Sequence, residues 1–241
     1  MKTKKILLFI QSVLIVLLLL ACSNNQASEQ DNEQTSINTP EADISEAFEI
    51  SSKPENNAKM LVVYFSMPET TNPNNMTTDE DNSVVVINGE VLGNTQYLAY
   101  LIQEKTTADI FRLEAKMPYP TNHSNLVDLA KEEQNAKARP ELLSKIENIE
   151  QYDVIFLGYP NWWGDMPMII YTFLESVDLS GKTIIPFNTH GGSGFSDTIN
   201  TIASLQPNST VEQNGFSVSR NAVENCEEDV TEWLKSINLI N

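Results

Sequence analysis

The segment DVIFLGYP, residues 153–160, decides the fold of this 241-residue chain. It begins at an aspartate, continues as an apolar run and ends in residues typical of a loop. Two further segments have the same pattern, KMLVVYFS at residues 59–66 and KTIIPFNTH at residues 182–190. Apolar runs without polar alternation are typical of parallel strands whose sheet is covered by helices on both faces. The three segments therefore predict the centre of such a sheet.

Helical patterns alternate with these strands. They are NTQYLAYLIQEKT, MIIYTFLES, FSDTINTIASL and EEDVTEWLKSI, at residues 94–106, 168–176, 195–205 and 227–237. ADIFRLE at residues 108–114 and STVEQNGFSV at residues 209–218 supply two shorter strands. Strands that alternate with helices are typical of an α/β fold, so the sequence predicts a doubly wound, five-stranded parallel sheet.

An insertion interrupts the alternation after the first strand. Its first part, MPETTNPNNMTTDEDNS, has the composition of a loop, and SVVVINGEVL follows it. Asn88-Gly89 between two short β-runs is a strong hairpin signal, because both turn positions need positive φ. We expect a β-hairpin above the end of the first strand, near the helix that begins at Asn94.

Charge and cysteine content exclude several classes of function. The chain has 33 acidic and 15 basic residues and a formal net charge of −18, which argues against nucleic acid and against adhesion of the domain surface to anionic lipid. The charge permits steering toward a basic protein partner, or it is simply a soluble acidic surface. Two Cys and two His form no metal-ligand cluster. Acidic neighbours oppose ionisation of Cys226, so we expect an inert thiol.

The N-terminus has the pattern of a secretory signal. Three lysines within the first five residues precede an apolar run at residues 6–21. The run ends LLLLACSNN, which resembles the lipobox of bacterial lipoproteins and implies a signal peptide at residues 1–21 and lipidation of Cys22. The alternative is an uncleaved anchor, although a spanning helix needs about 20 residues. Either reading tethers the protein extracytoplasmically, to the outer face of the cytoplasmic membrane.

Residues 22–57 differ in composition from the rest of the chain. They are rich in Ser, Asn, Gln, Glu and Asp, and they contain one aromatic residue, Phe48, and one cation, Lys53. Such a segment cannot bury enough apolar surface to fold. The sequence therefore predicts a disordered acidic tether followed by one folded domain at residues 58–241.

Three loops follow strands that should be neighbours, and ligands of open parallel sheets bind outside the carboxyl ends of such strands. The first loop offers Ser66 and the residues Gly93, Asn94 and Thr95, which open a helix. Free N–H groups and the positive end of the helix dipole attract an anion there, which makes a phosphate site. Alternatively, Asn94 or Thr95 only caps the helix.

The other two loops carry aromatic residues and glycines. Trp162 and Trp163 lie in a segment of loop residues, where large rings either fold onto the core or stack on a flat ligand. Residues 189–194, THGGSG, let backbone approach a ligand closely. Alternatively, this stretch is a satisfied histidine followed by a flexible turn. The convergence of all three loops at adjacent strand ends favours a ligand site.

These loops resemble those of the flavodoxin family, and most closely of flavodoxin-like domains with YFS, GYPxWWG and THGGSG after successive strands. The resemblance covers residues 59 to about 239, and ARPEL and GKTIIPF agree with it. It implies a sheet of order 2-1-3-4-5, flavin mononucleotide (FMN) at its carboxyl edge and an electron-transfer role. By position, the cofactor-binding residues would be Ser66, Gly93, Asn94 and Thr95 at the phosphate, Tyr159, Pro160, Asn161, Trp162, Trp163 and Gly164 at the isoalloxazine, and Thr189, His190, Gly191, Gly192, Ser193 and Gly194 on the opposite wall.

The resemblance leaves two hypotheses open. A typical flavodoxin has a compact T-x-T-G-N-T phosphate loop, whereas only GNT remains here, separated from Ser66 by the insertion. If the loop closes at the base of the hairpin, the protein is an FMN-dependent electron carrier or a reductase of a small acceptor, with an unknown redox partner and a low potential. No catalytic residue is assigned, and His190 is the only candidate proton donor in the loops. If the loop is broken, the domain is a non-redox module that binds another planar ligand or a protein. We expect Trp163 nearer the ligand and Trp162 packed under the loop.

Overall fold

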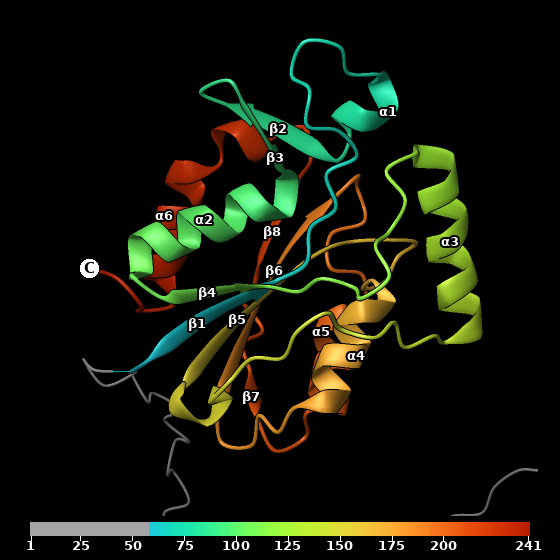
Figure 1. Ribbon diagram of the computed structural model, residues 1–241. Helices are drawn as coiled ribbons and strands as arrows, with labels where there is room; N and C mark the ends of the chain where they lie inside the picture. The colour runs from blue at the N-terminus through green and yellow to red at the C-terminus, as the bar shows by residue number, and fades with distance from the viewer. Residues whose placement is uncertain (1–57) are drawn as a thin grey trace, which may run out of the picture. The chain divides into compact units, whose positions relative to one another are not determined.

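The computed structural model describes residues 58–241 (Figure 1). The predicted signal peptide, the lipidation site Cys22 and the acidic tether lie outside the described residues. Among the helices that are described, none is long and apolar enough to cross a membrane. The fold below is that of the predicted domain.

The domain is built on a parallel sheet in the predicted order. β1 (Met60–Tyr64) lies between β4 (Asp109–Arg112) and β5 (Val154–Pro160), and β6 (Thr183–His190) pairs with the other side of β5. The predicted last strand is split into β7 (Thr210–Val211) and β8 (Phe216–Ser219), which both pair with β6. The order 2-1-3-4-5 is therefore confirmed, with its fifth position shared by two short strands.

A proline in β6 explains the split. The carbonyl of Ile184 accepts a hydrogen bond from the amide of Glu212, so Ile184 presents its backbone to the fifth strand. Two residues further on, Pro186 faces the same side and has no N–H to donate. A Cβ on Gly215 would also lie 2.6 Å from the Pro186 carbonyl oxygen. The edge strand therefore stops pairing at Pro186 and resumes beyond it.

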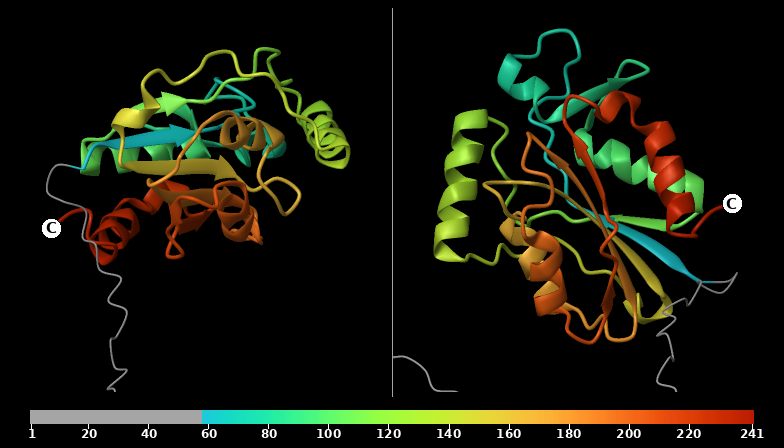
Figure 2. Two further views of the ribbon diagram at one scale, coloured as in Figure 1. Left: turned by 90° about the horizontal axis from the view of Figure 1, so that it is seen from below. Right: turned by 180° about the vertical axis from the view of Figure 1, so that it is seen from behind.

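Helices cover both faces of the sheet (Figure 2). α2 (Asn94–Thr106) and α6 (Glu227–Ser236) pack on one face with Val62 and Phe156, and α4 (Met168–Ser176) and α5 (Thr198–Leu205) pack on the other with Leu61 and Val63. Successive residues of β1 thus enter different cores, which is why the strand is apolar throughout. The remaining short elements are α1 (Thr78–Asp81) and the 3₁₀ helices η1 (Ile149–Gln151) and η2 (Val223–Asn225).

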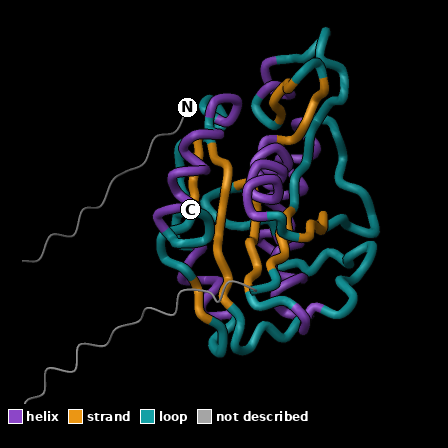
Figure 3. The backbone as a smooth tube through the Cα atoms, turned by 90° about the vertical axis from the view of Figure 1, so that its left-hand side faces the viewer, coloured by secondary structure: helices purple, strands orange, loops and turns teal. Residues whose placement is uncertain are grey.

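The predicted hairpin is present. β2 (Val84–Ile87) pairs antiparallel with β3 (Glu90–Gly93), and the turn residues Asn88 and Gly89 have φ of 53° and 85°. Its two strands stand apart from the central sheet (Figure 3). Val85 and Leu92 join the core on the α2 side. The hairpin therefore packs beside α2, and the loop that precedes it is left to lie near the strand ends.

Two α-helices were absent from the sequence prediction, the four-residue α1 within the predicted loop and the longer α3 (His123–Ala136). α3 packs against α4, yet only Leu126 and Ala130 of its 14 residues are buried. Its apolar stripe is confined to Leu126, Leu129 and Ala130, which is a short signal of helical periodicity. The prediction failed there because this helix contributes so few side chains to the core.

Candidate functional site

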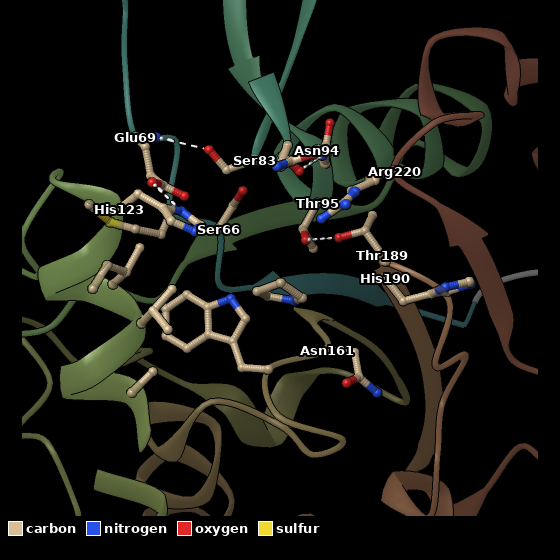
Figure 4. A pocket seen from close by; sticks show the side chains of 18 of the residues that line it. Ser66, Glu69, Ser83, Asn94, Thr95, His123, Asn161, Thr189, His190 and Arg220 are labelled. Atoms are coloured by element: carbon tan, nitrogen blue, oxygen red, sulfur yellow. Dashed lines mark hydrogen bonds and ion pairs between the residues drawn. The ribbon is translucent and has the colours of Figure 1, made fainter. Parts of the chain in front are cut away.

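The carboxyl ends of β1, β5 and β6 meet at a cavity of about 250 Å³ (Figure 4). All three predicted loops contribute to its wall, so the expected convergence is confirmed. The predicted site residues that line it are Ser66, Asn94, Thr95, Pro160, Asn161, Trp162, Trp163, Thr189, His190 and Gly191. The predicted residues Gly93, Tyr159, Gly164, Gly192, Ser193 and Gly194 do not line it.

The split loop closes at the base of the hairpin. A Cβ built on Gly93 would lie 2.2 Å from the Ser66 hydroxyl oxygen, so the two residues are in direct contact across 27 positions of sequence. Gly93 has a φ of −65°, which any residue adopts. A glycine is needed here because a side chain would collide with the Ser66 hydroxyl, and the backbone conformation does not require it. Gly93 thus lies behind the cavity wall and lets Ser66 form it.

The first turn of α2 leaves backbone donors without partners. The Gly93 amide donates to the Gln96 side chain at 3.2 Å and the Asn94 amide donates to the Ser83 carbonyl at 3.0 Å. The amides of Thr95 and Gln96 have no intrahelical acceptor, because the first N–H groups of any helix lack one. Together with the helix dipole they form an anion-binding end.

Neither Asn94 nor Thr95 caps the helix with its side chain, so the capping alternative is wrong. The Asn94 amide group donates to the Asn82 carbonyl at 3.0 Å, and its Oδ1 is buried without a hydrogen-bond partner among the described residues. The Thr95 and Thr189 hydroxyls are 2.8 Å apart and hydrogen bonded. A ligand that brings a hydroxyl group into the cavity would satisfy the Asn94 oxygen.

The loop that carries Trp162 and Trp163 is a tight turn. Trp162 and Asp165 exchange two backbone hydrogen bonds, and the residues between them, Trp163 and Gly164, have φ of 54° and 77°. This is the pattern of a type I′ turn. Gly164 therefore serves the turn, and Trp163 projects from its tip.

The two indole rings have different surroundings. Trp162 makes edge-to-face contacts with Phe65 and Tyr119, with ring centroids 5.4 and 5.8 Å apart, and so packs under the loop as expected. Trp163 is 54% exposed, and its indole N–H donates to the Val127 carbonyl at 3.3 Å. Both rings line the cavity, but only Trp163 has a large surface left to cover.

Hydrogen bonds of the glycine-rich residues 191–194 stabilise the loop that follows β6. The carbonyl of Gly194 accepts hydrogen bonds from the side chains of Asn161 and Asn188, at 2.9 and 2.7 Å. The Gly192 amide donates to Nδ1 of His190 at 2.9 Å. Burial lowers the pKa of His190, so the neutral ring carries its proton on Nε2. The turn thereby fixes the orientation of an imidazole that lines the cavity.

Tyr159 faces the core. Its side chain is fully buried, and its hydroxyl donates to the Thr198 hydroxyl at 2.8 Å. Strand alternation explains the placement, because Tyr159 and the cavity-lining Pro160 point to opposite sides of β5. Burial raises the pKa of Tyr159, so this phenol is no acid at the site.

The cavity contains two charged features that the sequence prediction missed. Oε2 of Glu69, from the insertion, is hydrogen bonded at 2.9 Å to Nδ1 of His123, the first residue of α3, and burial raises the pKa of Glu69. Arg220 follows β8, and its amide donates to the His190 carbonyl at 2.8 Å. His123 reaches the cavity because α3 packs beside it, and Arg220 because β8 pairs with β6. No local sequence motif indicates either arrangement.

Cys226 is not among the residues that line the cavity. The Cys226 side chain is 1% exposed, and burial raises the pKa of its thiol to about 11. The expectation of an inert thiol is therefore confirmed. No group of three His, Cys, Asp or Glu side chains that could hold a metal ion occurs within residues 58–241.

Comparisons with known proteins agree with this architecture. A family model described as flavodoxin matches residues 83–237. The crystal structure of a putative flavoprotein from Bacteroides eggerthii shares 29% identity over 75% of this chain and 98% of its own, with a TM-score of 0.56. One from Bacteroides uniformis shares 26% identity over 74% and 98%, with a TM-score of 0.51. A flavoprotein from Lactobacillus acidophilus, solved in complex with FMN, is more distant, at 16% identity over 73% and 98% and a TM-score of 0.49. No curated protein matches the chain.

Proposed function

Because the chain belongs to the flavodoxin family, we propose that it is an FMN-binding redox protein, an electron carrier or a reductase of a small acceptor, held at the outer face of the cytoplasmic membrane. Family membership supports a flavin-binding redox role in general. The choice of FMN, the reaction and the location are the parts that we propose.

The observation that carries the proposal is the closed phosphate loop. The insertion separates Ser66 from Gly93 in sequence, but the hairpin returns Gly93 to van der Waals contact with the Ser66 hydroxyl. The free amides of Thr95 and Gln96 lie at the start of the same helix. This arrangement suits a phosphate group and supports the proposal that the cavity binds FMN.

The rest of the cavity suits the other parts of FMN. Trp162, Trp163 and Pro160 provide apolar surface for a flat ring system, and the unpartnered Oδ1 of Asn94 accepts a hydrogen bond from a hydroxylated chain. His190 also lines the cavity, and its Nδ1 accepts the Gly192 amide, which leaves the N–H at Nε2 as its donor. The donor set and the aromatic wall therefore fit a phosphorylated, hydroxylated and planar ligand.

When bound, FMN supplies one-electron and two-electron redox chemistry. The chain's own residues hold the ligand, exclude water from one face of its ring and set the local charge. The net charge of −18 opposes any further negative charge in the cavity, so we propose a reduction potential below that of free FMN.

The location rests on the N-terminal sequence. Lipidation of Cys22 would anchor the domain through the segment at residues 23–57, and the acceptor would be a partner protein or a small molecule reached from outside the cytoplasm. The substitution C22A should prevent incorporation of radiolabelled palmitate and release the protein from the membrane fraction. Unchanged labelling in C22A would exclude this mode of anchoring.

Flavin titration of the full chain tests the function. Bound flavin quenches indole fluorescence, so FMN should produce saturable quenching, and riboflavin, which lacks the phosphate, should bind much more weakly. Equal affinity for the two would mean that the phosphate cradle does not operate. Absence of quenching at high FMN concentration would overturn the proposal and would favour a non-redox module that binds a different planar ligand.

A further inference from the structure

The cavity contains one unpaired positive charge. Arg220 is the only lysine or arginine among the residues that line it, and its guanidinium forms no ion pair or hydrogen bond with any of residues 58–241. Glu69 is the only acidic lining residue, and its Oε2 is already hydrogen bonded to Nδ1 of His123 at 2.9 Å. In a chain with more than twice as many acidic as basic residues, an arginine left without a carboxylate needs an explanation.

The fold directs this arginine to the cavity. β8 pairs with β6 in a register that sets Ser219 beside His190, and the Arg220 amide donates to the His190 carbonyl. A Cβ on Gly191 would lie 3.3 Å from Nη1 of Arg220, so the glycine leaves the guanidinium its space. Figure 4 shows the side chain of Arg220 extending toward Thr95 at the start of α2. Arg220 and the first residues of α2, Asn94 and Thr95, therefore line the same cavity.

We propose that Arg220 is the side chain that recognises the phosphate dianion of the bound flavin, and that it provides most of the discrimination between FMN and riboflavin. This inference rests on the proposed FMN role. A guanidinium donates in a planar fork that matches phosphate oxygens, and such charge-assisted hydrogen bonds are stronger than neutral ones. Ser66 and the α2 amides supply the neutral donors of the same site.

The charge balance of the chain gives Arg220 a second role. An acidic protein repels a phosphate dianion at long range, and the helix dipole supplies only about half an elementary charge. A full positive charge beside the cradle offsets that repulsion locally. Because Arg220 is exposed, its contribution should fall as salt screens it.

The test compares R220Q and R220K with the unmodified full chain. R220Q should weaken FMN binding by about tenfold or more, as expected for losing a charge-assisted hydrogen bond, and should leave riboflavin binding unchanged. R220K keeps the charge without the planar fork and should lie between the two. K145Q is the matched control, since it removes one positive charge at an exposed position between α3 and η1. Equal FMN affinities for R220Q and K145Q would overturn the inference.

A flavin-free measurement separates this inference from the proposed function. Inorganic phosphate added to the ¹⁵N-labelled protein should shift the Thr95 amide resonance in a saturable manner, and the shift should need much more phosphate in R220Q. If FMN fails to bind but this difference is seen, the proposed function falls while Arg220 still recognises phosphate. If phosphate shifts the Thr95 resonance equally in both proteins, the role of Arg220 is refuted whatever FMN does.

Discussion

Replacing Gly93 with alanine should disable the phosphate cradle without changing the backbone. Gly93 has φ and ψ of −65° and 144°, which alanine adopts without strain. The new methyl group would lie 2.2 Å from the Ser66 hydroxyl oxygen and 3.3 Å from Cδ of Pro68. An ordinary contact between such atoms is about 3.5 Å or more. The Ser66 hydroxyl must therefore move by more than about 1 Å, which exceeds the tolerance of about 0.5 Å within which a binding group has to be held.

The expected loss of FMN affinity in G93A follows from the displacement of the Ser66 hydroxyl. Rotation of the Ser66 side chain away from its position costs about 0.5–1.5 kcal/mol if it leaves a rotamer minimum. The lost hydrogen bond to a charged phosphate is worth about 1.5–3 kcal/mol. Together these costs, about 2–4.5 kcal/mol, weaken FMN binding by about 30- to 1,600-fold. The thermal midpoint should fall by only a few degrees, because the strain is local.

The assay is a fluorescence titration with FMN and with riboflavin, alongside thermal unfolding of each variant. S66A gives the matched background, since it removes the oxygen that the new methyl group would meet. G93A should be harmful in the natural background and nearly neutral when S66A is already present. If G93A binds FMN like the unmodified protein, Ser66 does not serve the phosphate. If G93A costs as much in the S66A background, the steric argument is wrong.

Three further variants test other parts of the structure. Burial raises the pKa of Glu69 above its ordinary 4.5, so the folded protein binds the carboxyl proton more tightly than the unfolded chain. Stability should therefore fall as the pH rises from the pKa of the unfolded state to that of the folded state. E69Q should flatten this dependence of the thermal midpoint on pH. G158A should destabilise by about 1–3 kcal/mol in urea unfolding, because its methyl group would lie 2.1 Å from the buried Phe187 ring; an unchanged midpoint would contradict the packing. W163F should bind FMN less tightly with little loss of stability, since the ring is half exposed, whereas W162F should lower stability; the reverse result would exchange the two roles.

The sequence predicted those parts of the fold that local pattern determines. The three continuous apolar runs became β1, β5 and β6, because strands buried on both faces leave no polar positions. The hairpin followed from Asn88-Gly89, since few dipeptides accept positive φ at both positions. α3 was missed because its apolar stripe is short, Leu126, Leu129 and Ala130, in a helix whose other positions are mostly polar.

Some residues of the candidate site were also predicted from local pattern, and others were not. Ser66, Asn94, Thr95 and Trp162 line the cavity as expected, because loops at the carboxyl ends of adjacent parallel strands must converge. Tyr159 was placed on the wrong side, although alternation along β5 was enough to show it. Gly194 was expected at the ligand, but it accepts two side-chain hydrogen bonds that hold the loop. A glycine in a loop motif does not reveal whether its backbone serves a ligand or a turn.

The insertion explains how a phosphate loop survives being split. Antiparallel pairing sets Val84 opposite Gly93, so the two-residue turn at Asn88 and Gly89 returns the chain to the place where the hairpin began. The Ser83 carbonyl then accepts the Asn94 amide, which joins the base of the hairpin to the first turn of α2. A slip of the hairpin by one residue would reverse which side chains face the core, and the core contacts of Val85 and Leu92 oppose it. The position of Gly93 against Ser66 is therefore fixed by hydrophobic packing of the hairpin, and the length of the loop before it has little influence on the cradle.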